Sequence, residues 1–193
     1  SRGVAERNHS FHGLNIKPIL TIILTKKSNI ENDLNGVKAI TLNDNRWSRP
    51  DIKATQLLPN VLAKTLASKN NAYESIFIDD EGFVTEGSSS NIWVLNKEHQ
   101  LITRNLDGKI LSGITRNSIS LFAKKNNITV VEKKFTKIEL LNAKEVFLTS
   151  ASSFIMPIVQ IDDQNINQGL VGNISLELRK LYFNNFFIKN FTI

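Results

Sequence analysis

YESIFIDDEGFVTEGSSSNIWVLNKEHQLIT, residues 73–103, is the stretch that decides the fold class. Apolar and β-branched residues gather in four short runs, at residues 73–78, 84–85, 91–95 and 101–103. The turn residues Asp80-Glu81-Gly82 separate the first two runs, and a polar stretch separates the last two. Short runs of this kind bounded by turn residues are typical of β-hairpins. The sequence therefore predicts two hairpins in this region.

On either side of the hairpins, the apolar spacing predicts helices. Leu57, Val61, Leu62 and Leu66 lie at helical spacing within residues 56–68, which predicts an amphipathic helix. Three more helices are predicted, over residues 114–125, from a capping box at residues 136–139 to about 142, and over residues 174–184. Gly113 precedes the first of these, whose first turn carries backbone N–H groups without intrahelical partners.

Further apolar runs predict the remaining strands. They are residues 19–25 (ILTIILT), 37–42 (VKAITL), 128–131, 146–149 and 158–161, with a loop or short helix over residues 26–36. Many short strands and a few helices give an α+β domain. A chain of 193 residues forms one domain or the larger part of a two-domain protein.

The composition argues against several classes of function. The formal charge is +6, but the Lys and Arg residues are mostly single or paired and are not interleaved with aromatics, so we expect no nucleic-acid partner. No apolar stretch reaches the roughly 18 residues that span a bilayer, so we expect no membrane contact. With no cysteine and no secretory-like start, a cytoplasmic location is expected. Three His, one Met and no Cys leave little basis for a metal site.

Three segments carry polar or Gly residues where a plain core would not need them. They are residues 51–53 (DIK), 86–91 (EGSSSN) and 111–116 (LSGITR). Each has an ordinary structural interpretation when taken alone: a solvated lysine, a turn glutamate with a flexible serine loop, and a helix start. Their order and spacing are what make them informative.

Together they resemble the fold-type IV pyridoxal-phosphate enzymes, and most closely the D-amino acid aminotransferases of that family. The resemblance is carried by Arg2-Gly3, Arg7-Asn8-His9, DIKATQLLPNVLAK (51–64), VTEGSSSNIWV (84–94), ILSGITR (110–116), Phe135-Thr136 and LTSASSFIMPIVQID (148–162). It implies the fold of the family's large C-terminal cofactor-binding domain. Residues 36–193 would form that domain, and residues 1–35 would be the end of the N-terminal and interdomain region, with the small N-terminal domain absent.

The resemblance also implies a role for each site residue. Lys53 would hold the cofactor, pyridoxal 5'-phosphate, as a Schiff base and then carry the proton, in a partly desolvated site where an amine is more easily neutral. Glu86 would pair with the pyridine nitrogen. The backbone of Ile114 and Thr115, after Gly113, would bind the phosphate, which the free N–H groups of a helix start favour independently.

The remaining site residues follow from the same resemblance. Leu111 would press on the ring face, and Ser90, Asn91, Ser150, Ala151 and Ser152 would complete the cofactor site. Ala151 departs from the family pattern, which commonly has a Thr that reaches the phosphate; Ser150 or Ser152 could replace its hydroxyl. Arg7 and His9 match the pair that binds the substrate carboxylate in the D-amino acid branch, and the planar Arg fork suits a carboxylate.

The resulting hypothesis is transamination between a D-amino acid such as D-alanine and a 2-oxo acid such as 2-oxoglutarate, by a homodimer. Three alternatives stay open: a branched-chain aminotransferase, an aminodeoxychorismate lyase, and a truncated fragment without catalysis.

Overall fold

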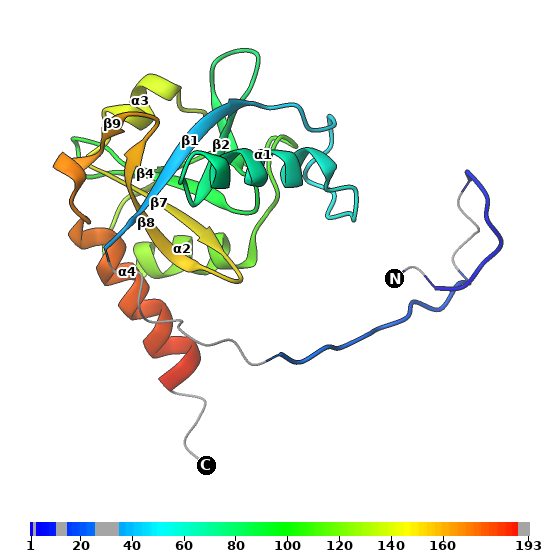
Figure 1. Cartoon of the computed structure of the whole chain (residues 1–193). Helices are drawn as coiled ribbons and strands as arrows, with labels where there is room; N and C mark the ends of the chain where they lie inside the picture. Colours follow the sequence, from blue (N-terminus) through cyan, green and yellow to red (C-terminus); the bar gives the residue numbers. More distant parts are fainter. Residues whose placement is uncertain (2, 11–14, 26–34, 189–193) are drawn as a thin grey trace. The chain divides into compact units, whose positions relative to one another are not determined.

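The computed structural model describes residue 1 and residues 3–10, 15–25 and 35–188 (Figure 1). The chain divides into two compact units, residues 1–30 and residues 31–193, and each is described by itself. Arg2 lies outside the described residues, as does most of the predicted loop or short helix over residues 26–36. The functional division of the chain near residue 35 stays a prediction.

In the first unit, the predicted strand over residues 19–25 is wrong. This segment has no regular secondary structure, and its apolar side chains are exposed, with Leu20 at 84% and Leu24 at 92%. A strand needs a neighbour that takes up its N–H and C=O groups. Among the described residues only Ile19 finds such a partner, by exchanging hydrogen bonds with Ser1 at 2.7 and 3.2 Å.

In the second unit, the strands form one mixed sheet. They are β1 (Val37–Asn43), β2 (Glu74–Ile78), β3 (Val84–Gly87), β4 (Asn91–Leu95), β5 (Leu101–Thr103), β6 (Val130–Glu132), β7 (Glu145–Ser150), β8 (Phe154–Ile161) and β9 (Gln164–Asn165). Their order is β3-β2-β1-β8-β7-β4-β5-β6, with β9 beside β8. Both predicted hairpins are confirmed, because β2 pairs with β3 and β4 with β5, each antiparallel.

The pairing of distant strands brings the site segments together. β4 lies antiparallel to β7, with Asn91 opposite Thr149, so the end of the 86–91 segment faces the start of the serine run 150–153. β1 lies parallel to both β2 and β8, and the loop that follows β1 contains Lys53. Three segments far apart in sequence therefore reach one region of the sheet.

The predicted helices are confirmed with small shifts in their bounds. They are α1 (Leu58–Lys69), α2 (Ile114–Lys125), α3 (Lys137–Leu141) and α4 (Asn173–Phe183), together with a 3-10 turn (Asn167–Gly169) and a π-helical turn (Asn184–Ile188). The predicted capping box is present at the start of α3: the Thr136 hydroxyl accepts from the backbone of Glu139, and the Glu139 carboxylate accepts from the backbone of Thr136.

The core lies on both faces of the sheet because successive strand residues alternate. In β4, Ile92 and Val94 join the cluster that includes Leu140 of α3. Trp93 between them joins the opposite cluster, where α2 and α4 pack on the sheet (Figure 1). Its ring stacks on that of Phe147, with centroids 5.9 Å apart.

Helix α1 does not bury its leucine stripe. Ala63 and Ala67 are the buried residues, while the exposed apolar residues are Leu57, Leu58, Val61, Leu62 and Leu66. The small alanines let the helix approach the sheet closely enough for the Ser75 hydroxyl of β2 to reach the Ala63 carbonyl at 2.7 Å. An apolar face of the helix is therefore left without a partner in the described part of the chain.

Candidate active site

A pocket of about 1170 Å³ opens in the second unit. Its wall contains every cofactor-binding residue that the sequence predicts in this unit, namely Lys53, Glu86, Ser90, Asn91, Leu111, Gly113, Ile114, Thr115, Ser150, Ala151 and Ser152. The structure thus brings together residues that are spread over a hundred positions of the sequence. Their chemical roles stay predictions at this point.

Lys53 lies in the loop between β1 and α1, which has no helix or strand of its own. Its side chain lines the pocket but is exposed, so the expected desolvation of this lysine is wrong for the described chain. The physical reason is local: next to Lys53 the loop makes short-range contacts, such as the Ile52 N–H to the Arg49 carbonyl at 3.1 Å and the Arg49 guanidinium to Asp51. An amine in this position is accessible to a ligand.

Glu86 is a buried carboxylate on β3 with three hydrogen-bond donors. Its Oε2 accepts from the Asn91 side-chain amide at 3.1 Å and from the Leu111 backbone at 3.0 Å, and its Oε1 accepts from the Arg46 guanidinium. A carboxylate offers about four lone-pair positions. One position on Oε1 is therefore left for a further donor in the pocket.

Arg46 is a site residue that the sequence did not reveal. Its guanidinium binds both oxygens of Asp44, at 2.9 and 2.7 Å, contacts Glu86, and lies 4.8 Å from the centroid of the Phe77 ring. Burial opposes ionisation of Asp44, but the hydrogen bonds and charge of Arg46 outweigh it and hold the pKa of Asp44 below its usual range. The closeness of Asp44 and Arg46 in sequence was the only available signal, and such short spacings are common on surfaces.

At Glu86, unlike at Asp44, the effect of burial on the pKa outweighs the effect of Arg46. Burial raises the pKa of Glu86 to about 7, against the opposing effect of the Arg46 charge and of the Leu111 N–H. Arg46 is shared with Asp44, so it compensates only part of the cost of burying the second carboxylate. A cationic N–H donor at the remaining Oε1 position would stabilise the charged form of Glu86.

This raised pKa predicts a pH-dependent stability of the ligand-free chain. The folded state binds the proton of Glu86 more tightly than the ordinary pKa of 4.5 would allow, so this stabilisation is lost as the pH rises through about 7. Glu86→Gln keeps the shape and does not titrate. The free energy of unfolding of the unmodified chain, minus that of the variant, should fall by about 3 kcal/mol between about pH 4.5 and 8. Urea unfolding at the two pH values measures this; a constant difference would contradict it.

The start of α2 lacks a side-chain cap. Gly113 is the N-cap and supplies no side-chain cap, so the first N–H groups of this 12-residue helix are open to a ligand. The Thr115 hydroxyl is buried, with the residue 1% exposed, and has no hydrogen-bond partner in the described structure. A buried unpaired hydroxyl is costly, and a phosphate at the helix start would satisfy it.

Gly113 is also required by the close approach of α2 to β4. A Cβ atom at this position would lie 2.3 Å from Asn91 Oδ1, where no real Cβ contact fits. We predict that Gly113→Ala forces the start of α2 away from Asn91, misaligns the first N–H groups of the helix, and weakens phosphate binding by about tenfold, the effect of losing one good hydrogen bond. Calorimetric titration with inorganic phosphate tests this. The control is Gly82→Ala, outside the pocket wall: its φ of 84° strains an alanine, but the added Cβ meets nothing within 4 Å, so the variant tests whether a loss of stability alone lowers phosphate affinity. Equal affinities of the two variants would contradict the prediction.

The serine run after β7 forms another wall of the pocket. The Ser150 hydroxyl accepts from the Ser153 backbone at 2.9 Å and lies 3.3 Å from the Ser152 hydroxyl, while Ala151 is exposed. The tight turn therefore already engages Ser150. The Ser150 and Ser152 hydroxyls can bind a ligand only with the proton or lone pair that these contacts leave free.

Arg7 and His9 belong to the first unit and are exposed there. Because each unit is described by itself, their predicted contact with a substrate carboxylate stays a prediction. Within the described residues, no group of three or more His, Asp or Glu could hold a metal ion, and no helix is long and apolar enough to cross a membrane.

Comparison with known proteins gives the family. A family model for the amino-transferase class IV enzymes matches residues 2–161. D-alanine aminotransferases of Staphylococcus aureus (strain N315) and Staphylococcus haemolyticus are 43% and 40% identical, over 93% of this chain and 64% of those proteins. A branched-chain amino acid aminotransferase of Thermobaculum terrenum in its PLP form superimposes with a TM-score of 0.73 at 29% identity, over 82% of this chain and 53% of that one.

The chain thus spans less than two thirds of the length of these curated relatives. The predicted family and the α+β fold of its cofactor-binding domain are confirmed. A family match over most of its residues, and a pocket that contains the motifs behind the resemblance, place the chain in the class IV aminotransferase family.

Proposed function

We propose that this chain binds pyridoxal 5'-phosphate and takes part in transamination between a D-amino acid, such as D-alanine, and a 2-oxo acid, such as 2-oxoglutarate. One observation carries the proposal. Lys53, Glu86 and the open start of α2 line a single pocket, in a chain that is 40–43% identical to D-alanine aminotransferases. These three features supply an amine, a carboxylate and a phosphate site.

The residues present fit this cofactor. The phosphate would bind at the N-terminus of α2, where the buried Thr115 hydroxyl lacks a partner. The ring nitrogen would donate to the free position on Glu86 Oε1, and Leu111, half-buried in the pocket wall, would contact the ring. When bound, pyridoxal 5'-phosphate supplies an electron sink that stabilises negative charge on the substrate Cα.

The chain's own residues would do the rest. Lys53 has the accessible amine needed to hold the cofactor and to move a proton at its Nζ. Glu86, fixed by Arg46 and Asn91, would keep the ring nitrogen protonated. Arg46 is then a positioning residue, because it acts through Glu86.

Substrate choice is the finer part of the proposal. Arg7 and His9 would bind the substrate carboxylate in the manner of the D-amino acid branch. The superposition on branched-chain aminotransferases fits the alternative of an L-amino acid substrate, but those solved structures are 24–30% identical to the chain, against 40–43% for the D-alanine enzymes. A cofactor-binding fragment without turnover is the second alternative.

The test is to load the chain with pyridoxal 5'-phosphate and then present D-alanine and L-leucine separately. We expect D-alanine to convert the cofactor absorbance from the aldehyde-derived form to the amine form, and 2-oxoglutarate to restore it. Conversion by L-leucine alone would assign the chain to the branched-chain reaction. Cofactor binding without conversion by either amino acid would identify the non-catalytic fragment.

We also propose a homodimer, and a cytoplasmic location is carried forward as part of the proposal. The exposed apolar face of α1 supports assembly with a second copy, because contiguous apolar surface of this kind usually marks a protein contact. We predict that Leu62→Glu shifts the chain from dimer to monomer in light scattering. Leu121→Glu, an exposed leucine on α2, is the matched control and should leave the mass unchanged; a monomeric unmodified chain would contradict the dimer.

A further inference from the structure

We propose that Glu74 is a positioning residue of the pocket, whose carboxylate holds the serine loop (residues 88–90) in the shape that receives the cofactor. The inference rests on the proposed function, since the ligand is the same pyridoxal 5'-phosphate. Neither the motifs of the sequence nor the chemistry described above uses Glu74. Figure 1 shows β2, which begins at this residue, within the sheet and next to α1.

All three serines of the loop contact the Glu74 carboxylate, whose Oε1 also accepts from the Ser75 N–H at 2.9 Å. The residue is 1% exposed. Its Oε1 accepts from the Ser88 hydroxyl and its Oε2 accepts from the Ser90 hydroxyl at 2.8 Å. The exposed Ser89 hydroxyl lies within reach, at 3.4 Å from Oε2. A single buried carboxylate therefore binds both ends of a loop that lines the pocket.

Gly87 shows how closely the loop is packed on this carboxylate. A Cβ atom at Gly87 would lie 2.2 Å from the Ser90 hydroxyl and 3.2 Å from the Glu74 side chain. The Gly87 N–H donates to the Ser90 carbonyl at 2.7 Å, which closes the loop, and the Ser88 N–H donates to the Ser75 carbonyl at 3.0 Å. The loop is thus a compact turn built around Glu74.

The carboxylate also decides which way the serine hydroxyls face. A hydroxyl has one proton and two lone pairs. Since Ser88 and Ser90 donate their protons to Glu74, only their lone pairs remain for a ligand. These two hydroxyls therefore offer acceptors to a ligand, whereas the start of α2 offers N–H donors. A phosphate-bearing ligand is therefore oriented with its phosphate at α2.

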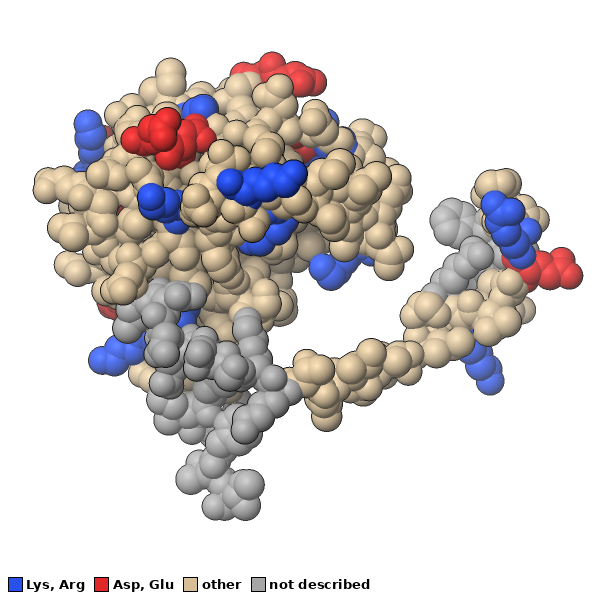
Figure 2. All heavy atoms as spheres, viewed as in Figure 1, with Lys and Arg blue, Asp and Glu red and all other residues tan. Residues whose placement is uncertain are grey.

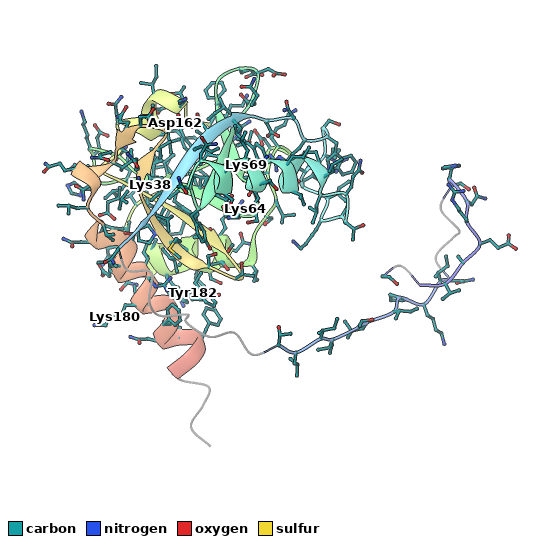
Figure 3. The ribbon with its side chains drawn as sticks, viewed as in Figure 1. Lys38, Lys64, Lys69, Asp162, Lys180 and Tyr182 are labelled. Carbon is teal, nitrogen blue, oxygen red and sulfur yellow. The ribbon has the colours of Figure 1, made fainter. Side chains whose placement is uncertain are left out.

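The buried charge of Glu74 has a partner at the pocket edge. Lys64, labelled in Figure 3, extends from α1. Its Nζ lies 3.8 Å from Glu74 Oε1 and 4.2 Å from the centroid of the Tyr73 ring. The Tyr73 hydroxyl in turn lies 2.5 Å from the Ser153 hydroxyl, in the second serine run of the pocket. Two neighbouring residues at the start of β2 thus contact both serine segments.

Lys64 pairs with Glu74 individually and does not belong to a continuous basic patch. On the face drawn in Figure 2, Lys and Arg side chains are dispersed and Asp and Glu side chains lie among them. The salt bridge from Lys64 to Glu74 joins a side chain that is 43% exposed to one that is 1% exposed. Glu74 is therefore the buried side chain of this ion pair, and its removal would leave the Ser88 and Ser90 hydroxyls without their acceptor.

The test compares two ligands on the same variants. Glu74→Ala should weaken binding of pyridoxal 5'-phosphate by about tenfold or more, because two hydroxyls lose their acceptor and the loop is released. Affinity for inorganic phosphate alone, which binds at α2, should stay within about twofold. Glu74→Gln keeps one acceptor oxygen and the side-chain volume, so its affinity for the cofactor should lie between that of Glu74→Ala and that of the unmodified chain.

The control and the fold are measured alongside. Glu81→Gln, an exposed glutamate in the turn of the same hairpin, should change neither affinity. Amide NMR spectra of the ligand-free chain should show shifts at residues 88–90 in Glu74→Gln but not in Glu81→Gln. Should Glu74→Ala fail to fold, Glu74→Gln and its amide shifts decide the question.

Two results would overturn the role of Glu74: an equal loss of affinity for both ligands in a folded variant, or unchanged cofactor binding together with unchanged amides at residues 88–90. Failure of the proposed function looks different. In that case the unmodified chain itself takes up phosphate but not pyridoxal 5'-phosphate, while the amide shifts of Glu74→Gln still report whether Glu74 holds the loop.

Discussion

Replacing Lys53 by alanine is expected to abolish turnover and the covalent retention of the cofactor. Lys53 lines the pocket with an exposed amine, and the only other lysine among the described wall residues is Lys64, which is engaged with Glu74 and Tyr73. No other described lysine can therefore take over. Loss of the group that moves the proton lowers the rate by up to about 10⁴, and loss of the covalent attachment adds to this.

The measurement has two parts. Borohydride reduction of the loaded chain, followed by peptide mapping, should place the cofactor on Lys53 and should give no label in Lys53→Ala. Steady-state assays with D-alanine should show no turnover by the variant above background. A small amine such as methylamine should restore part of the proton transfer, because it can enter the space that the missing side chain leaves.

A lysine outside the pocket gives the matched control. Lys69 ends α1 and is absent from the pocket wall, so Lys69→Ala should retain both the label and the rate. A label on Lys64 in the unmodified chain would contradict the assignment of Lys53. So would a variant Lys53→Ala that turns over at a tenth of the normal rate without added amine.

Local sequence signals predicted the elements that depend on neighbouring residues. α2 begins at Ile114 because Gly113 can cap it without a side chain, and α3 begins after Thr136 because the capping box is formed within four residues. The pocket segments were assigned to one site because their motifs resemble those of the family. The apolar spacing of α1 predicted the helix but not which face it buries.

Contacts between distant residues were not predictable in the same way. The run at residues 19–25 has the apolar character of a strand, yet pairing depends on a neighbour that no local signal specifies. Arg46 reaches Glu86 across 40 positions, and Glu74 reaches Ser88 across 14. A single sequence carries no record of such pairs, so Arg46 and Glu74 were missed, while motifs placed the predicted site residues in one pocket.

Glu86→Gln is expected to lower turnover by about 10² to 10³, the usual effect of removing one preorganised electrostatic group. Glutamine fills the same space, and its oxygen can still accept from the Leu111 N–H, although its NH2 group then faces the Arg46 guanidinium and loses that hydrogen bond. Glutamine carries no negative charge, so it would no longer keep the ring nitrogen of the cofactor protonated. The rate with D-alanine should fall while cofactor affinity changes much less, because the proposed phosphate site at the start of α2 is left unchanged.

The same substitution separates function from stability. As the pH rises through about 7, the unmodified chain must ionise a buried carboxyl, whereas Glu86→Gln does not. Above about pH 7, Glu86→Gln should therefore be more stable relative to the unmodified chain than it is at low pH, although it turns over more slowly. Parallel loss of stability and rate would mean that Glu86 only supports the fold; opposite changes mean that its buried charge is maintained for the chemistry, at a cost in stability.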